Sequence, residues 1–245
     1  MEPSITFVSL GPGEPELITL KSLKVLRQAD IIYCPSTLSK SGKQLSRSAD
    51  ILQALDIPSG AISLFMVPMS KQRDAALEAY DNVRKESVIK YKEGKRIVIV
   101  AEGDSGFYSS IHYIYDKFIE DNIPVKRLAG IPAFIAAGAL AGLHIVKQEE
   151  KLIVLPGIVT QNELNEYLEN NMTVVIMKLS QCANEIQEYI RQNPKHTYHY
   201  FENVGTEKEY YSYNQNELVS KTFPYFSLMI IKPPILSNCD VSSFS

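Results

Sequence analysis

The stretch ITFVSLGPGEPELITL, residues 5–20, decides the fold class of this chain. It opens with a run rich in β-branched residues, which favours a β-strand, and this run ends in a Gly-Pro-Gly turn. Apolar residues then recur at close to helical spacing over residues 15–28. A second β-branched run follows at residues 29–34. The order strand, turn, helix, strand predicts a βαβ unit and a mainly parallel sheet.

The alternation of apolar runs and helical patterns continues along the chain. A helix rich in small residues is expected at residues 132–143, and it indicates a junction because small residues permit close backbone approach. We expect an N-terminal α/β domain over residues 1–128 and a C-terminal α/β domain over residues 129–245. Further strands are expected at residues 62–67, 97–101, 123–130, 151–155, 173–179, 197–201 and 225–231, and helices at residues 74–93, 161–170 and 182–192.

The composition is that of an ordinary globular chain. Of its 245 residues 45% are hydrophobic and 22% charged, with a net charge of −3, so a disordered chain is excluded and a nucleic-acid partner is not expected. Three cysteines stand far apart without a C-x-x-C pair, which argues against a disulfide framework and a cysteine-rich zinc site. The absence of a signal-peptide pattern and of an apolar run of about 18 residues predicts a cytoplasmic protein with no membrane partner.

The turn Gly11-Pro12-Gly13 follows the first expected strand. Glu16 stands where a dinucleotide fingerprint has its third glycine, and no Gly-Lys-Ser/Thr follows as in a P-loop. Pro12 also lacks a backbone N–H, which weakens any phosphate cradle. A phosphate ligand is therefore disfavoured, and taken alone the turn is better explained as a tight link between strand and helix.

Glu102, Gly103 and Asp104 follow the strand expected at residues 97–101. Ligands of open parallel sheets sit beyond the carboxyl ends of strands, where carboxylates can accept hydrogen bonds from a ribose diol or an amine. The alternative is a polar turn in which Asp104 or Ser105 caps the next helix. The Gly-Pro-Gly turn lies at the same edge of the sheet, which favours the functional interpretation.

Other catalytic patterns are missing from the sequence. The four histidines include no H-E-x-x-H pair, and no G-x-S-x-G elbow is present, so neither a protein-bound metal nor a hydrolase is expected. Residues 38–48 form a polar, basic stretch, interpreted either as a solvated loop or as a receiver of acidic ligand groups.

Four motifs, in this order, resemble the tetrapyrrole methylase family: VSLGPGEPELITLKSLKVLRQADIIYCPS (8–36), VAEGDSGFYSS (100–110), AGIPAFIAAGALAGL (129–143) and VVIMKL (174–179). The resemblance implies two α/β domains, with a mainly parallel N-terminal sheet, a mixed C-terminal sheet and the cofactor in the interdomain cleft. It also implies S-adenosylmethionine as methyl donor, a tetrapyrrole substrate and a homodimer.

The stretches FMVPMSKQ (65–72) and PYFSLMIIK (224–232) are similar to those of precorrin-2 C(20)-methyltransferases. The resemblance thus implies methylation of the C(20) meso carbon of precorrin-2 or cobalt-precorrin-2 in cobalamin biosynthesis, and no motif distinguishes the two substrates. Two alternatives stay open: another enzyme of the family, including a diphthine synthase-like one, and a non-catalytic module that binds tetrapyrrole or cofactor.

Matching motifs imply the site residues. Cofactor contacts are expected from Pro12, Glu102, Gly103, Asp104, Phe107, Pro132, Ala133, Met177 and Ser227, and substrate contacts from Lys40, Lys43 and Arg47. No catalytic residue is assigned, because Tyr108, Tyr225 and Asp104 are unranked candidates for a base.

The chain departs from the family pattern in three places. Ser105 stands where the family often has proline, Ala129 precedes Gly130 where proline is frequent, and Pro35 replaces an acidic residue of uroporphyrinogen-methylating members. The last departure disfavours uroporphyrinogen as the substrate.

Overall fold

A computed structural model describes residues 2–39, 42–68 and 74–234. The chain forms two compact units, which divide between Ala136 and Ala137. The boundary expected between residues 128 and 129 lies before this point and stays a prediction.

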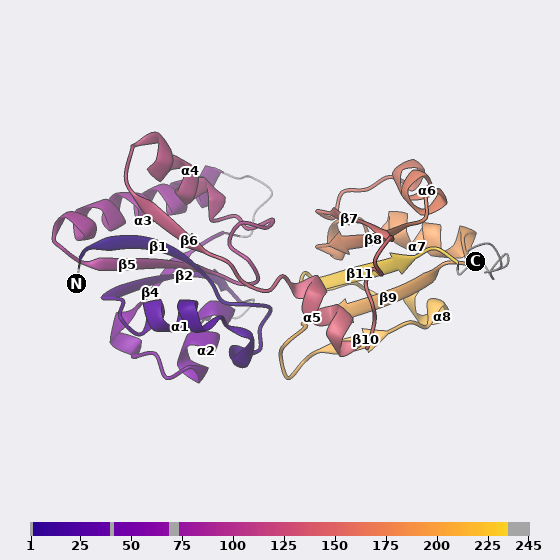
Figure 1. Ribbon diagram of the computed structural model, residues 1–245, viewed down its shortest axis with the longest axis horizontal. Helices are drawn as coiled ribbons and strands as arrows, with labels where there is room; N and C mark the ends of the chain where they lie inside the picture. Colours follow the sequence, from indigo (N-terminus) through magenta and orange to yellow (C-terminus); the bar gives the residue numbers. More distant parts are fainter. Residues whose placement is uncertain (1, 40–41, 69–73, 235–245) are drawn as a thin grey trace, which may run out of the picture. The chain divides into compact units, whose positions relative to one another are not determined.

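The first unit is built on a parallel sheet, as the sequence predicted (Figure 1). Five strands run parallel in the order β4-β2-β5-β1-β6. The short β3 pairs antiparallel with Thr37 and Leu38 at the carboxyl end of β2. The strands are β1 (Ser4–Ser9), β2 (Ile31–Leu38), β3 (Gln44–Leu45), β4 (Ile62–Met66), β5 (Arg96–Ala101) and β6 (Val125–Leu128).

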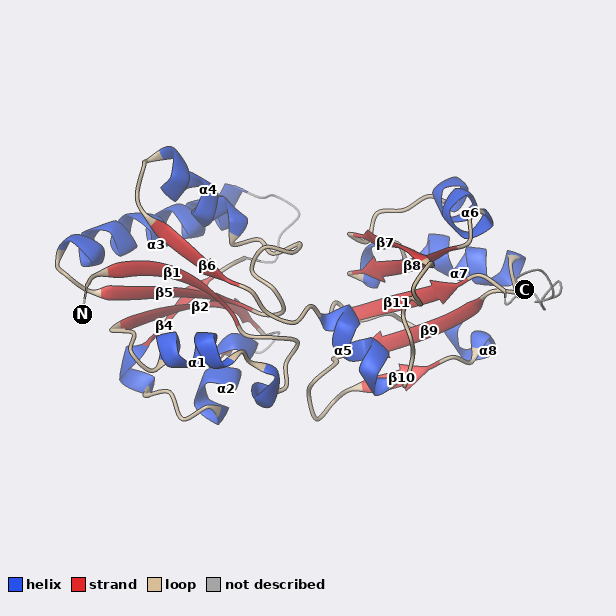
Figure 2. Cartoon of the chain, viewed as in Figure 1, coloured by secondary structure: helices blue, strands red, loops and turns tan. Residues whose placement is uncertain are grey.

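Helices cover both faces of this sheet, which is why its central strands read as continuous apolar runs (Figure 2). Leu26 of α1 and Leu52 of α2 pack with Val98 on one face, whereas Val83 of α3 and Phe118 of α4 share a cluster on the other. The helices are α1 (Leu20–Leu26), α2 (Arg47–Ala54), α3 (Asp74–Lys92) and α4 (His112–Glu120).

The single helix expected over residues 15–28 is wrong in its first half. Residues Pro15–Leu17 form a 3₁₀ turn, and α1 begins only at Leu20. Thr19 causes this break: it is extended, with φ −73° and ψ 144°, and its side chain accepts a hydrogen bond from the Ser22 backbone N–H at 3.1 Å. Such an N-cap satisfies a helix donor only if the residue itself stays non-helical.

The second unit contains the mixed sheet that was predicted. Its order is β10-β9-β11-β8-β7, and within it only β7 and β8 pair in parallel. The strands are β7 (Lys151–Leu155), β8 (Met172–Met177), β9 (Thr197–Glu202), β10 (Tyr210–Ser212) and β11 (Ser227–Lys232).

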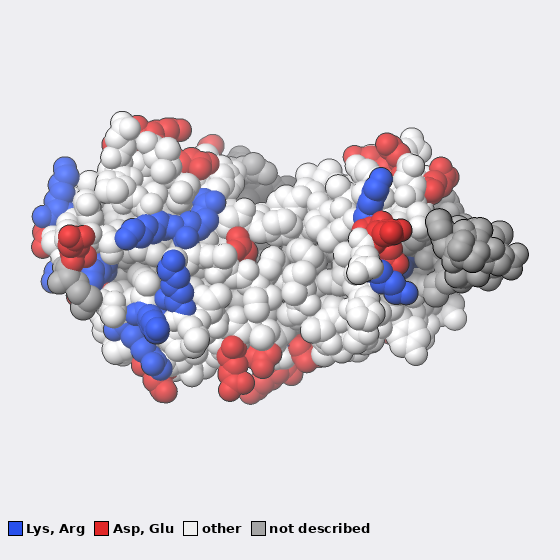
Figure 3. All heavy atoms as spheres, in the orientation of Figure 1, with Lys and Arg blue, Asp and Glu red and all other residues white. Residues whose placement is uncertain are grey.

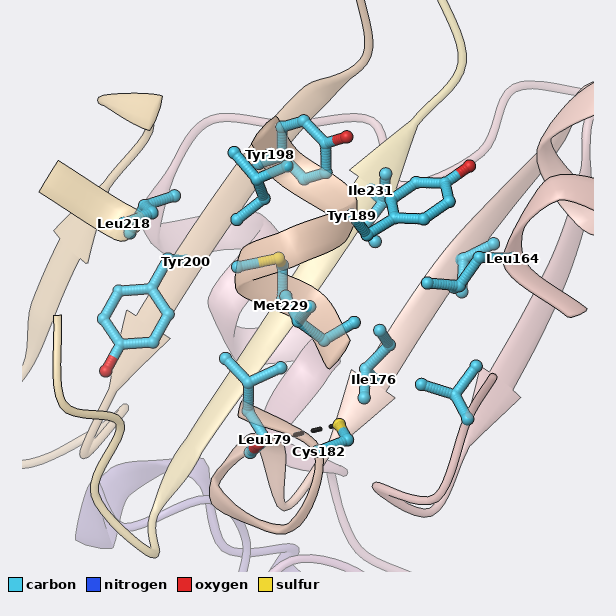
Figure 4. Packing of buried hydrophobic residues seen from close by; sticks show 14 of the residues in the cluster. Leu164, Ile176, Leu179, Cys182, Tyr189, Tyr198, Tyr200, Leu218, Met229 and Ile231 are labelled. Carbon is cyan, nitrogen blue, oxygen red and sulfur yellow. Dashed lines mark hydrogen bonds between the residues drawn. The ribbon is translucent and has the colours of Figure 1, made fainter. Parts of the chain in front are cut away.

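One face of this sheet carries the core of the second unit (Figure 4). Ile176, Tyr198 and Met229 alternate with residues of the opposite face and pack against three helices, α6 (Gln161–Glu169), α7 (Ala183–Gln192) and α8 (Gln215–Leu218). Cys182 belongs to this core, and its thiol donates a weak hydrogen bond to the Leu179 carbonyl at 3.6 Å. Burial raises the pKa of Cys182 to about 12, which favours the protonated thiol at neutral pH.

Gly157 allows a close approach between two backbone segments after β7. A Cβ on this residue would lie 2.6 Å from the Met177 carbonyl oxygen and 2.7 Å from that of Lys178. Its φ is +88°, a conformation that also favours glycine. Both conditions exclude a side chain here.

We expect Gly157→Ala to lower the free energy of unfolding by about 1–3 kcal/mol more than Gly94→Ala does, because overpacking adds to the conformational strain. Gly94 is the matched control, since its φ is +85° and no atom lies within 4 Å of the position of its Cβ. Chemical denaturation of both variants measures the difference. Equal losses of unfolding free energy in the two variants would show that crowding at Gly157 does not contribute to the destabilisation.

Candidate functional site

The chain leaves the sheet toward opposite faces at two neighbouring strands. β1 leads to α1 on one face, while the adjacent parallel strand β5 leads to α4 on the other. In open α/β sheets, ligands bind in the crevice beyond the carboxyl ends of such a strand pair. The loops after β1 and β5 are therefore the candidate site in the first unit, and they contain the two glycine turns singled out in the sequence.

The two loops are joined by a reciprocal backbone pair. Gly11 N–H donates to the Gly103 carbonyl at 3.1 Å, and Gly103 N–H donates to the Gly11 carbonyl at 2.6 Å. Their φ values are +80° and +66°, which glycine adopts without steric cost. No atom lies within 4 Å of where a Gly103 Cβ would stand, so this backbone is open on one side. Pro12, beside this pair, is buried.

Ser9 ties the loop after β6 to the same junction. Its hydroxyl donates to the Leu128 carbonyl at 2.6 Å and accepts from the Ser105 N–H at 2.8 Å. A Cβ on Gly130 would lie 2.4 Å from the Ser9 Cβ, so only glycine fits there. The three loops after β1, β5 and β6 thus form one packed junction. The Ser105 N–H bond is also one that a proline at this position could not donate.

Asp104 joins two of these loops through its carboxylate. Oδ1 accepts the Gly106 N–H at 2.8 Å, and Oδ2 accepts the Gly130 N–H at 2.7 Å. Both oxygens therefore hold backbone, and the residue positions the loops. Each carboxylate oxygen has a further lone pair, so the expected cofactor contact stays a prediction.

Glu102 and Arg47 were expected in different parts of the site, and the structure places them in contact. Arg47 Nε lies 3.4 Å from Glu102 Oε2, with 24% and 26% of the two side chains exposed. Burial raises the pKa of Glu102; the nearby Arg47 opposes this shift and Asp50 adds to it. Ser46 caps α2 and so holds Arg47 in the first helical turn.

Aromatic side chains flank the junction. The Phe107 ring lies 4.7 Å from that of Tyr108 and 5.7 Å from that of Phe134, centroid to centroid. Phe134 belongs to the first turn of α5 (Ala133–Leu140), which Pro132 precedes, so these expected contact residues lie close to Phe107. Tyr108 has a φ of +49°, a strained conformation of the kind that gathers at functional sites.

In the second unit, Met177 and Ser227 lie at the same end of the sheet. Met177 ends β8 and pairs with Leu228, the neighbour of Ser227 on β11. Ser227 is buried, and its hydroxyl donates to the Pro224 carbonyl at 2.6 Å. Lys178, after Met177, adopts a left-handed φ of +55° beside the close approach at Gly157. Tyr225 is 46% exposed.

The described part of the basic stretch at residues 38–48 contains the short strand β3 and the start of α2. Ser39 N–H donates to the Lys43 carbonyl at 2.8 Å, which closes a turn between β2 and β3. Lys43 is exposed, whereas Arg47 is the ion-paired residue on α2. Lys40 lies outside the described residues, as do Met69 and Ser70 of the FMVPMSKQ stretch.

The roles of Ser9 and Gly130 in this junction were not expected from the sequence. A small polar residue just before a Gly-Pro-Gly turn was the available signal, but its partners on β6 and on the β5 loop are about a hundred positions away. Within residues 2–39, 42–68 and 74–234, no group of three His, Cys, Asp or Glu side chains could hold a metal ion. None of the described helices combines the length and apolar character needed to cross a membrane.

One family model matches most of this chain. The family model described as Tetrapyrrole (Corrin/Porphyrin) Methylases matches residues 4–214. The chain belongs to this family. The match reaches from β1 into the second unit and includes the three-loop junction, so the resemblance drawn from four motifs is confirmed.

Two relatives of this tetrapyrrole methylase carry the same kind of name. A precorrin-2 C(20)-methyltransferase of a Sinorhizobium species is 28% identical over 232 residues, covering 91% of this chain and 93% of the relative. A probable cobalt-precorrin-2 C(20)-methyltransferase of Methanocaldococcus jannaschii is 31% identical over 172 residues, which is 70% of each chain.

Solved structures share the fold. A cobalt precorrin-4 methyltransferase matches with a TM-score of 0.69 at 15% identity, covering 94% of both chains. A uroporphyrin-III C-methyltransferase of Thermus thermophilus, complexed with S-adenosylhomocysteine, matches with a TM-score of 0.66 at 16% identity, covering 94% of this chain and 92% of that one. The predicted α/β fold is thereby confirmed.

The Asp104 bonds to two loops give a direct test. We expect Asp104→Asn to lower the free energy of unfolding by about 1.5–3 kcal/mol, the range for hydrogen bonds to charged groups. Hydrogen exchange at the Gly106 or the Gly130 amide should also accelerate, because Asn offers one acceptor oxygen in place of two. Asp116→Asn, at an exposed position on α4, is the matched control. Unchanged exchange at both Gly106 and Gly130 would refute the positioning role.

The raised pKa of Glu102 predicts the pH dependence of a second variant. At a pH above the ordinary pKa of a glutamate, the buried charge of Glu102 lowers the free energy of unfolding. At a pH below that pKa the side chain is protonated in both the folded and the unfolded chain, so this cost is absent. Glu102→Gln is therefore expected to be more stable than the parent chain at pH 7–8 and equal to it near pH 3.

Thermal unfolding across this pH range measures the effect. Glu14→Gln, at an exposed position on the β1 loop, controls for the general effect of removing one negative charge. A Glu102→Gln variant that is no more stable than the parent at neutral pH would contradict the role of burial.

Proposed function

We propose that this tetrapyrrole methylase transfers a methyl group from S-adenosylmethionine to the C(20) meso carbon of precorrin-2 or cobalt-precorrin-2, in cobalamin biosynthesis. The observation that carries the proposal is the three-loop junction beyond the carboxyl ends of β1 and β5, where the chain turns to opposite faces of the sheet. It occurs in a chain that aligns over most of its length with two proteins named for this reaction.

The residues of the junction fit a sulfonium nucleoside. The open side of Gly103 permits close approach to the backbone, and Phe107 with Phe134 offers an apolar surface for an adenine ring. The Glu102 carboxylate supplies negative charge for a cationic ligand. Pro12, Asp104, Pro132 and Ala133 shape the same junction, and Met177 with Ser227 is proposed as the contribution of the second unit.

The donor brings an activated methyl group, so the protein does not have to activate the leaving group. It has to align the donor with the acceptor carbon and exclude water. Asp104 fixes the loops that do this, since its oxygens hold Gly106 and Gly130. The methylated carbon must also lose a proton. Glu102, whose pKa is raised by burial, is better suited to accept it than Asp104, whose carboxylate already holds two N–H groups.

The substrate carries many carboxylates, which favours a basic contact. Lys43 is exposed on the β2–β3 turn and is the preferred candidate for contacting the substrate carboxylates, together with Lys40. Arg47 lies 3.4 Å from Glu102, so its reversal to an acid would disturb the proposed donor site as well. A homodimer in the cytoplasm, without a bound metal, completes the proposal.

The test is an anaerobic methyl-transfer assay with S-adenosylmethionine and either precorrin-2 or cobalt-precorrin-2. We expect one added methyl by mass spectrometry, located at C(20) by NMR. Lys43→Glu should raise the KM for the tetrapyrrole by about tenfold, because it replaces an attraction by a repulsion. The affinity for S-adenosylmethionine should stay unchanged. Lys195→Glu, at an exposed position in the second unit, is the control.

The other outcomes separate the alternatives. A methyl group at another position, or on another acceptor, would identify a different enzyme of the family. Binding of S-adenosylmethionine without transfer to either substrate would favour a non-catalytic module. An unchanged KM in Lys43→Glu would remove this lysine from the substrate site.

A further inference from the structure

The first unit contains a second candidate ligand site, a hollow of about 470 Å³. It lies on the face of the sheet that α1 covers, between α1 and the edge strand β6. Residues of β1, β5 and β6 form its floor, and Lys21 and Gln28 come from the α1 segment.

Strand register separates this hollow from the three-loop junction. Ser4 pairs with Arg96 and Thr6 pairs with Val98, so on β1 and β5 the floor lies along the amino-terminal halves of the strands. On β6 it extends to Leu128, a lining residue that also contacts the junction, through the bond from Ser9. The junction lies beyond the carboxyl ends of the strands. The hollow is therefore a different place on the sheet from the proposed site of methyl transfer.

The hollow carries uncompensated positive charge. Lys21 and Lys126 are exposed and make no ion pair with any residue that the structure describes. The third cation, Arg96, is held by Asp30 through bonds of 2.8 and 2.9 Å and contributes little net charge. Arg127 lies over the Tyr115 ring at 3.8 Å. Figure 3 shows Lys and Arg side chains gathered on this unit, although the whole chain is acidic.

Thr6 supplies an independent observation. Only 4% of this residue is exposed, and its hydroxyl makes no hydrogen bond within the described part of the chain. Thr6 lies in the same row as Val98 and lines the hollow. The Thr6 hydroxyl oxygen is not among the fully enclosed polar atoms that lack a partner, so it is accessible from the hollow and can donate to a ligand acceptor there.

We propose that this hollow binds a small organic anion with two or more carboxylate or phosphate groups. Lys21 and Lys126 stand on different elements and would each receive one anionic group. Thr6 would donate to an oxygen between them. Val25, Val98 and Leu128 supply an apolar floor for the ligand's carbon skeleton. The volume falls in the range of small-molecule sites.

The test uses the full chain and two probes, tricarballylate and inorganic phosphate, in titration calorimetry at low ionic strength. We expect one saturable site, with tricarballylate binding more tightly than phosphate because it reaches both lysines. Lys21→Glu and Lys126→Glu should each weaken tricarballylate binding at least tenfold. Lys24→Glu is the matched control, since Lys24 is exposed on the same helix but does not line the hollow, and it should change binding less than twofold.

Thr6→Val tests the hydroxyl without changing charge or size. We expect several-fold weaker binding with unchanged thermal stability, because the hydroxyl has no partner to lose. Equal affinities for the two probes, with the same dependence on both lysines, would support a phosphorylated ligand.

Three results would overturn the proposal: no saturable binding of either probe, equal weakening by Lys24→Glu, or loss of binding only in Lys43→Glu. The last would place the anion at the β2–β3 turn. None of these measurements uses methyl transfer, so they are independent of the proposed function.

Discussion

The junction of three loops at the β1/β5 edge is the constraint on which the rest of the first unit depends. Its parts are the reciprocal Gly11–Gly103 bonds, the Ser9 hydroxyl and the Asp104 carboxylate. Each part is possible only because glycine occupies the positions where a Cβ would collide or where φ is positive. The sheet places the three loops near one another, and these hydrogen bonds join them into one packed junction.

This arrangement explains why two residues with different expected roles are coupled. Glu102 is held on the junction, and Arg47 is held by the N-cap of α2. A ligand that competes for either side chain changes the charge balance of the other. Asp104, by contrast, is committed to backbone amides and serves the loops around it.

Much of this fold could be predicted from the sequence because its signals are local. The β-branched runs and the intervening helical spacing indicated the parallel sheet, and Gly103 with Asp104 indicated the edge at which we propose the functional site. The interruption at Thr19, the short β10 and the Arg47–Glu102 contact could not be predicted in this way. The break at Thr19 depends on whether this residue caps the helix or continues it. The strand β10 and the Arg47–Glu102 contact depend on pairings that only the tertiary fold creates.

The place of β11 in the second sheet has a consequence for how the chain is made. This strand, Ser227–Lys232, comes last in the described chain but lies between β9 and β8. During synthesis the strands β7 and β8 can pair, and so can β9 and β10, but these two halves have no common strand until β11 emerges from the ribosome. The first unit completes its sheet with β6, about a hundred residues earlier. The nascent chain therefore carries a finished amino-terminal unit beside an open, apolar half-sheet, and that interval is when a chaperone would be needed most.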